Sequence, residues 1–347
     1  MGVFMNKLKL GLSSQNKSLP LLPAVLATLL IIGLSCLTAL GLGGIICICI
    51  SGAVFAFLTV TEKNIIPWLS IPLSFGAALL ISRDLLTAAA VLLYVPAGLI
   101  LAYCVLTKKS LSVTVAALTA GVAVSMFIYL TAAVVHLYGG SIKESYISFR
   151  DQLTELLREV MGLLRYMGED GQFYAYSDDI IEQLIHTFYM LLPGICAIAC
   201  QGCAYGMAKL FRLFSKLFGF MFLYNNKPYK VTLSAGAAAI FLIAYTVSIF
   251  SYEESVIAYS SINLSYILMP ASAIAGFHSI FSKDGFFRRK GPRTSKIILI
   301  VACGAVIFMS PLSVIPLLAM FGSGDAVGVA VSALLRARRN RNDDNQS

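Results

Sequence analysis

The fold of this chain is decided by residues 18–61, which read SLPLLPAVLATLLIIGLSCLTALGLGGIICICISGAVFAFLTVT. This stretch contains no Asp, Glu, Lys or Arg, and its 44 residues are too many for one membrane crossing. About 20 apolar residues let a helix span the hydrocarbon core. Glycines at positions 41, 43 and 44 lie near the centre of the stretch, where glycine permits a sharp reversal. The stretch therefore predicts a helical hairpin with crossings at 20–41 and 44–61.

The rest of the chain has the same character. Three more uncharged runs cover residues 85–107, 110–142 and 231–252. Of all residues, 58% are hydrophobic and 12% are charged, against about 25% charged in a soluble domain. Lipid cannot satisfy exposed backbone groups, so these runs must be helical.

The remaining crossings follow from the apolar runs between charged residues. They are expected at residues 64–82, 85–107, 111–138, 186–208, 231–251 and 255–281. Residues 297–335 are apolar but broken at Ser310-Pro311 and at Gly322–Asp325. They form either one crossing with an amphipathic tail or a helical hairpin, and the charge count below favours the hairpin. The predicted fold is an all-α polytopic transmembrane bundle of about 8–10 membrane segments.

Charges predict which ends of the helices face the cytoplasm. With the N-terminus inside and a terminal hairpin, 21 of the 26 Lys and Arg residues fall on the inner side. The outer side receives 12 of the 17 acidic residues. Cytoplasmic loops of membrane proteins carry an excess of Lys and Arg. We therefore expect a multi-pass protein of the cell membrane with both termini in the cytoplasm.

Four stretches follow from this topology: a five-helix membrane region (1–142), an outer loop (143–185), a second membrane region (186–335) and a basic tail (336–347). Within the outer loop, apolar residues recur at steps of three and four over 144–167, which predicts an amphipathic helix. Such a helix lies on the membrane surface or caps the bundle.

A net charge of +9 raises the question of nucleic-acid binding. The basic residues, however, lie in short clusters beside apolar runs, without a basic stripe interleaved with aromatic residues. Lys209, Arg212 and Lys216 share one helix face that suits anionic lipid headgroups. The expected partners are the lipid bilayer and a small solute or another membrane protein, with no nucleic acid.

Two groups of metal-ligating side chains have simpler explanations. Cys196, Cys200 and Cys203 share a helix face and suit a soft metal ion, but cysteine also packs as a small apolar residue. Glu182 and His186 are four residues apart, and acidic residues there also stabilise a helix N-terminus. GxSxG, HExxH and P-loop motifs are missing from the sequence. We expect neither an enzyme nor a bound metal or cofactor.

Polar side chains inside two predicted crossings supply the candidate ligand site. Tyr259, Asn263 and Tyr266 lie in the crossing at 255–281, and Gln201 and Tyr205 lie in the crossing at 186–208. Polar residues at this depth either join helices or line a cavity for a small molecule. Ser272 and Gly276 provide a small-residue face for close helix packing.

The stretch from Asn263 to Pro270, NLSYILMP, continues to Gly276–Ile280, GFHSI. It resembles a motif of the YybS-like family of bacterial multi-pass membrane proteins in its Asn, in the step of thirteen residues to the Gly and in the aliphatic residue that follows. That family's terminal Gly-x-x-Asp is matched by Gly322 and Asp325, but the first Arg follows only at 336. Such proteins are distantly similar to substrate-binding subunits of energy-coupling-factor transporters, which implies a role in small-molecule binding.

Two functions remain open at this point. The first is a membrane protein of transporter-subunit type that binds a small solute between the crossings at 186–208 and 255–281. The second is a non-transporting structural or regulatory membrane protein that recruits partners through its outer helix or its basic inner surface.

Overall fold

The computed structural model describes residues 20–61, 65–163, 165–167, 173–219, 233–251, 255–281 and 314–344. These residues are almost entirely helical, which confirms the predicted helical membrane bundle. The elements are α2 (Leu21–Ala39), α3 (Gly44–Thr61), α4 (Ile66–Ser82), α5 (Leu85–Val91), α6 (Tyr94–Leu106), α7 (Leu111–Tyr138), α8 (Ile142–Gly162), β1 (Arg165–Met167), β2 (Phe173–Ala175), α9 (Asp178–Leu217), α10 (Ala235–Phe250), α11 (Val256–Phe281) and α13 (Val314–Asp344).

Seven helical segments in the described part of the chain are long and apolar enough to cross a membrane. They are Leu21–Ala39, Gly44–Thr61, Leu85–Leu106, Leu111–Tyr138, Asp178–Leu217, Val256–Ile280 and Val314–Arg338. Two shorter apolar helices are Ile66–Ser82 and Ala235–Phe250. All nine overlap predicted crossings, although two of them, Asp178–Leu217 and Val314–Arg338, have different bounds from the predicted 186–208 and 297–335.

The chain divides into two compact units, which are described separately. The first unit comprises Met1–Lys109 and Val113–Tyr224, and the second comprises Ser110–Ser112 and Asn225–Ser347. This division follows contacts between helices. The four stretches predicted from charge and hydropathy follow topology across a membrane, and they stay a prediction.

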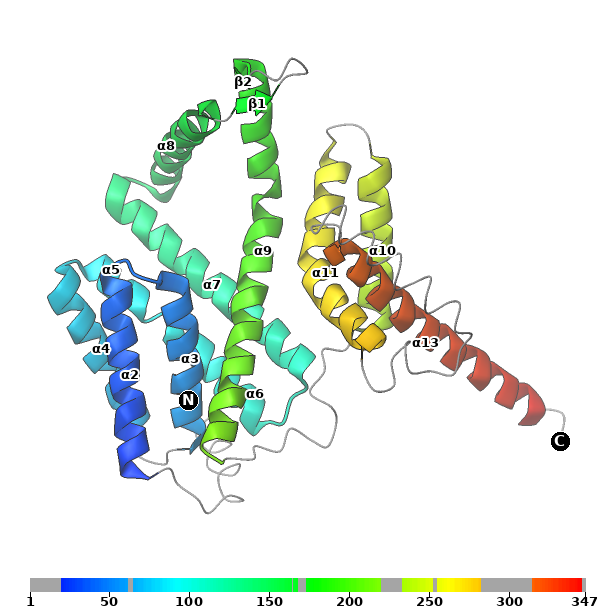
Figure 1. Cartoon of the computed structure of the whole chain (residues 1–347), viewed down its shortest axis with the longest axis horizontal. Helices are drawn as coiled ribbons and strands as arrows, with labels where there is room; N and C mark the ends of the chain where they lie inside the picture. Colours follow the sequence, from blue (N-terminus) through cyan, green and yellow to red (C-terminus); the bar gives the residue numbers. More distant parts are fainter. Residues whose placement is uncertain are drawn as a thin grey trace. The chain divides into compact units, whose positions relative to one another are not determined.

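The first unit is built around α3. The predicted reversal before this helix is present, with Gly41 and Gly43 at φ angles of 75° and 70°. From Ser51 to Thr61 every residue of α3 is buried, because α2, α6 and α9 pack around it. Figure 1 shows α9 running beside this bundle as its longest helix.

The predicted crossing at 85–107 is one membrane span made of two helices, α5 and α6. Pro96 has no N–H to donate to the carbonyl group of Leu92, so a regular helix cannot continue through this point. The turn tightens instead, and Val95 donates its N–H to the carbonyl oxygen of Leu92 at 2.9 Å.

The region predicted to form the outer loop and the crossing after it differ from their prediction in two ways. The amphipathic helix, expected at 144–167, is α8 and ends at Gly162, and Arg165–Met167 form a short strand paired antiparallel with Phe173–Ala175. The helix expected at 186–208 is α9, which spans 40 residues from Asp178 to Leu217. At 1.5 Å per residue, α9 is about 60 Å long, roughly twice the thickness of the hydrocarbon core.

The second unit consists, in its described part, of α10, α11 and α13. The predicted small-residue face is present at the contact of α11 with α13: a Cβ atom added to Gly276 would overlap the carbonyl oxygen of Leu318, and one on Gly322 would overlap that of Ser272. Contacts this close require glycine and are typical of membrane helices.

The predicted helix break at Gly322–Asp325 is wrong, because α13 continues through these residues. Packing of Gly322 against α11 compensates for the weak helix propensity of glycine. α13 also extends to Asp344, so most of the predicted basic tail is helical. The other expected break, Ser310-Pro311, lies outside the described residues, and the choice between one crossing and a hairpin for 297–335 stays open.

Candidate functional site

The five residues predicted to line a ligand site are divided between the two units. Gln201 and Tyr205 lie on α9 in the first unit, and Tyr259, Asn263 and Tyr266 lie on α11 in the second. All five side chains are half-buried. The ammonium group of Lys209 lies 5.0 Å from the centre of the Tyr205 ring, one helical turn away. A shared site for these residues stays a prediction.

The predicted cysteine face of α9 is used in part for helix packing. Cys196 is exposed, whereas Cys200 and Cys203 are half-buried. Cys203 of α9 lies next to Cys49 of α3, at the contact between these two helices. Within the described residues, no group of three or more His, Cys, Asp or Glu side chains is arranged to hold a metal ion.

Near the N-terminal end of α9, Glu182 forms an ion pair with Arg158 of α8. The Nε atom of Arg158 lies 3.0 Å from the Glu182 carboxylate, and this carboxylate raises the pKa of the guanidinium group. The contact braces α8 against α9, which explains the acidic residue without a metal ion.

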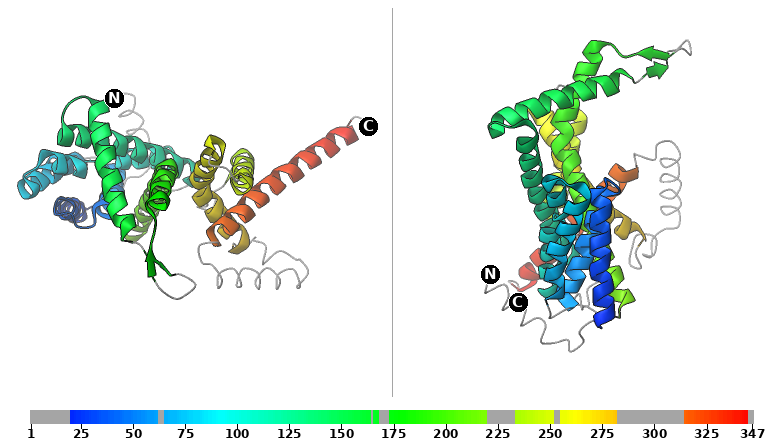
Figure 2. Two further views of the ribbon diagram at one scale, coloured as in Figure 1. Left: turned by 90° about the horizontal axis from the view of Figure 1, so that it is seen from above. Right: turned by 90° about the vertical axis from the view of Figure 1, so that its left-hand side faces the viewer.

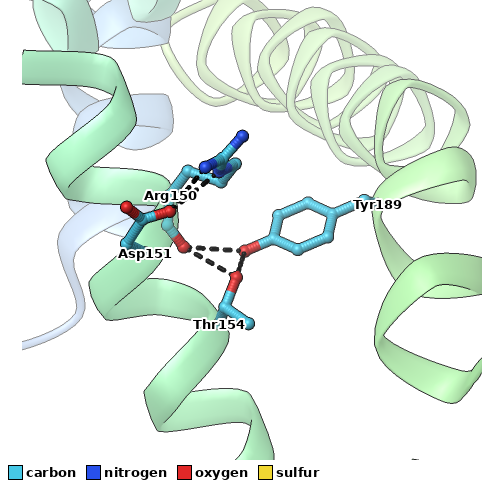
Figure 3. Close-up of polar contacts among 4 residues, drawn as sticks. All are labelled: Arg150, Asp151, Thr154 and Tyr189. Atoms are coloured by element: carbon cyan, nitrogen blue, oxygen red, sulfur yellow. Dashed lines mark hydrogen bonds and ion pairs between the residues drawn. The ribbon is translucent and has the colours of Figure 1, made fainter. Parts of the chain in front are cut away.

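A second contact braces the same two helices. The hydroxyl groups of Thr154 and Tyr189 lie 2.9 Å apart, and Tyr189 donates to the carbonyl oxygen of Arg150 at 3.1 Å (Figure 3). The views of Figure 2 show that α8 runs across α9 rather than along it. A helix in this position would lie parallel to a membrane surface, as predicted for the amphipathic helix.

The described part of the second unit contains a cavity of about 770 Å³ between α11 and α13. It lies beside the close contact at Gly276 and Gly322, because its lining residues Ser279 and Phe321 follow or precede these glycines closely in the sequence. α11 contributes Ser279 and Ile280, and α13 contributes Leu317, Met320, Phe321, Gly324, Asp325, Gly328, Val329 and Ser332. Because the residues from α13 recur at steps of three and four, they form one continuous face of that helix.

Asp325 is the only charged residue among the described residues that line this cavity, and the only charged residue in the sequence between residues 297 and 335. It lies eleven residues after the start of α13 and eleven before Arg336. Each distance corresponds to about 17 Å of helix, so the carboxylate lies near the middle of an apolar span. Ionisable residues at such a depth are rare and usually functional.

The Asp325 carboxylate is half-buried and has no hydrogen bond or ion pair to any residue that the structure describes. Two other polar groups line the cavity. The hydroxyl group of Ser332 donates to the carbonyl oxygen of Val329 at 2.8 Å, and Ser279 lies on the facing helix. The cavity thus combines apolar walls with one carboxylate that lacks a protein partner within the described residues.

None of the five predicted ligand residues lines this cavity. Tyr266, the nearest in sequence, precedes Ser279 by thirteen residues, or about 20 Å of helix. Asp325 was overlooked as a site residue because its two glycine neighbours suggested a loop. The signal was present in the sequence, as a single charge in the long apolar stretch from residue 297 to residue 335.

One comparison with known proteins gave a match. The model of the family described as predicted membrane protein (DUF2232) matches residues 25–326, which is most of the chain and includes Asp325. No curated protein and no solved structure matches the chain.

Proposed function

The chain belongs to the DUF2232 family of predicted membrane proteins, and we propose that it acts as a transporter-type subunit that binds a small solute between α11 and α13. The observation that carries the proposal is the Asp325 carboxylate, which faces the cavity from an apolar span without a partner among the described residues. The role is binding rather than catalysis.

The cavity suits a small organic molecule. Ligand pockets usually measure about 300–1,000 Å³ and combine apolar walls with a few polar groups. A charged residue at the centre of a membrane helix costs about 2.5–3.5 kcal/mol on insertion scales. A bound solute that contacts the carboxylate would offset part of this cost.

The predicted polar residues extend this proposal. Tyr259, Asn263 and Tyr266 lie on the same helix as Ser279, at the other end of α11. We propose that these three residues line the route by which the solute reaches the cavity along α11. The resemblance to YybS-like proteins and to energy-coupling-factor subunits agrees with this role, but it is an argument from analogy.

We propose that the protein lies in the cell membrane with both termini in the cytoplasm. Within the first unit, Phe57 of α3 contacts Phe211 and Phe218 of α9, so the C-terminal ends of these two helices lie together. The end of α9 carries Lys209, Arg212 and Lys216 and no acidic residue. The positive-inside rule assigns that end to the cytoplasm.

Labelling with a membrane-impermeant thiol reagent tests this orientation. In a variant without native cysteines, Asp170→Cys should react from outside, whereas Lys290→Cys and Asn342→Cys should react only after permeabilisation. Reaction of Asn342→Cys in intact cells would place the C-terminus outside and overturn the orientation.

The alternative function is recruitment of a protein partner by α8. The observation in its favour is that Leu156, Val160 and Leu163 of this helix are 51–76% exposed. Lipid covers such side chains equally well if α8 lies on the membrane surface.

The solute proposal is tested by thermal unfolding of the purified protein with vitamins, nucleobases, amino acids and amines. A ligand that binds the folded state raises its melting temperature. Gly328 lines the cavity, and a Cβ atom there would meet nothing within 4 Å, so Gly328→Leu should fill the cavity without a clash. Gly33→Leu on α2, which also has open space, is the matched control.

We expect at least one solute to stabilise the parent protein and Gly33→Leu but not Gly328→Leu. A solute that stabilises all three proteins equally binds elsewhere. If every stabilising solute behaves in that way, the cavity is not a binding site and the alternative function is favoured.

A further inference from the structure

We infer that the solute is an organic cation with an apolar body, such as a protonated or quaternary amine. This inference rests on the proposed function, because it names the chemical class of ligand for the cavity between α11 and α13. Three features of the cavity carry it: the sign of its charge, the nature of its walls and the small number of its oxygen ligands.

The charge excludes anionic solutes and favours cations. Asp325 is the only ionisable residue among the described residues that line the cavity. An anion would be repelled by the carboxylate in surroundings where charges are weakly screened. A cation would gain a charge-assisted contact and neutralise the one charge that the apolar span contains.

The walls require an apolar body on that cation. The same cavity is lined by the apolar side chains of Ile280, Leu317, Met320, Phe321 and Val329. Met320 and Phe321 are 42% and 41% exposed, so their surfaces are free to contact a ligand. Phe321 is also an aromatic ring next to the site of the proposed cation, and aromatic faces attract organic cations.

A bare metal ion fits this cavity poorly. Hard cations such as Ca²⁺ take about six to eight oxygen ligands. The side chains of the described lining residues offer only the carboxylate of Asp325 and the hydroxyl groups of Ser279 and Ser332, fewer oxygen atoms than such an ion takes. An organic cation needs only one counter-charge, because its apolar substituents take the place of the other ligands.

Two probes of similar shape and opposite charge provide the test. Tetraphenylphosphonium is a cation with an apolar shell, and tetraphenylborate is its anionic counterpart. Binding of each is measured by equilibrium dialysis against the purified full-length protein. The saturable part that is lost in Gly328→Leu and kept in Gly33→Leu is the binding to the cavity, which separates it from uptake by detergent.

We expect the cation alone to show this saturable binding. It should weaken at least tenfold in Asp325→Asn and remain in Asp325→Glu, which keeps the charge. Equal binding of the cation by Asp325→Asn would overturn the role of the carboxylate. Binding of both ions, lost together in Gly328→Leu, would overturn the inference and leave the proposed function standing.

If the cation shows no saturable binding, the inference that the ligand is an organic cation is wrong. The screen of vitamins, nucleobases, amino acids and amines then decides the proposed function separately. A neutral or anionic solute that stabilises the parent but not Gly328→Leu would keep the cavity as a binding site with another ligand.

Discussion

Glycine brings helices together in both units, with opposite consequences. In the first unit, Gly52 and Gly98 let α3 and α6 approach closely, and Phe55, Tyr94 and Met207 fill the space around them. In the second unit, Gly276 and Gly322 bring α11 and α13 together, but a cavity opens beside the crossing. The first contact forms a packed core, whereas the second forms a wall of a candidate binding site.

The two glycine contacts also differ in whether a charged residue lies beside them. The buried residues of α3 include no charged side chain, and the hydroxyl groups of Thr59 and Thr61 bond to the helix itself, as Thr59 does to Phe55 at 2.8 Å. The face of α13 beside its glycine contact carries Asp325. One packing motif therefore serves stability in the first unit and leaves room for a ligand in the second.

The largest expected effect separates the two glycine contacts. In Gly276→Ala the new methyl group overlaps the backbone carbonyl of Leu318, so the helices must move apart. In Gly52→Ala the nearest atom is the Met207 sulfur at 2.8 Å, at the flexible end of a side chain that can rotate away. We expect Gly276→Ala to lose about 1–3 kcal/mol or more and Gly52→Ala clearly less.

Thermal unfolding and size-exclusion chromatography of the two variants in detergent measure this difference. If both variants unfold at the same temperature, the backbones of α11 and α13 have room to separate, and the contrast between the two contacts is lost.

Much of the fold could be predicted because the bilayer constrains it. The uncharged stretch at 18–61 predicts the hairpin of α2 and α3, and the reversal occurs at the predicted glycines. Apolar length predicts where a helix crosses the hydrocarbon core, but not how far it extends beyond. For that reason the polar ends of α9 were missed at both termini.

The candidate site could be predicted only in part, because the glycines beside it are consistent both with a turn and with close packing of helices. In a soluble protein, Gly322-Ser-Gly-Asp325 suggests a turn. Beside a neighbouring membrane helix, the same residues continue as a helix and permit close packing. The choice depends on a partner, α11, that lies far away in the sequence. Polar residues in a span are visible from the sequence, but which of them meet across two helices is not.

The contact of α8 with α9 is a third interface, built from larger side chains. Leu157 is half-buried on α8, and its neighbour Leu156 is 55% exposed. Leu157→Asp should therefore cost up to about 1.5–3 kcal/mol, the value for burying a large aliphatic side chain. Leu156→Asp should cost little in detergent.

Melting temperatures of both variants test this prediction. If Leu156→Asp is as destabilising as Leu157→Asp, or separates the protein from a co-purifying partner, the exposed face of α8 is an interaction surface. That result would favour the alternative function.

Two tyrosine hydroxyl groups give a smaller contrast between core and periphery. Tyr94 of α6 is 0% exposed, and its hydroxyl group lies 2.9 Å from that of Ser74 on α4. Tyr189 bonds Thr154 at the same distance where water has access. Tyr94→Phe should cost about 0.5–1.5 kcal/mol, the usual net value of a hydrogen bond, and Tyr189→Phe less. Equal shifts in melting temperature would show that water does not replace the outer hydrogen bond.

The smallest effect on stability is expected at Asp325, where its sign matters more than its size. A carboxylate in an apolar span without a partner among the described residues destabilises the protein when no ligand is bound, so Asp325→Asn should raise the melting temperature. Because the group is half-buried and faces a cavity, the gain should lie near the lower end of the about 0.5–2 kcal/mol typical of stabilising substitutions. Thermal unfolding without ligand measures this gain, with Asp325→Glu as the control that keeps the charge.

The result would show whether Asp325 is a binding residue, because such residues often lower the stability of a protein. A rise in melting temperature together with loss of cation binding would identify Asp325 as one. A fall in melting temperature would mean that the carboxylate stabilises the second unit. The residues around the cavity would then serve packing, as the core of the first unit does.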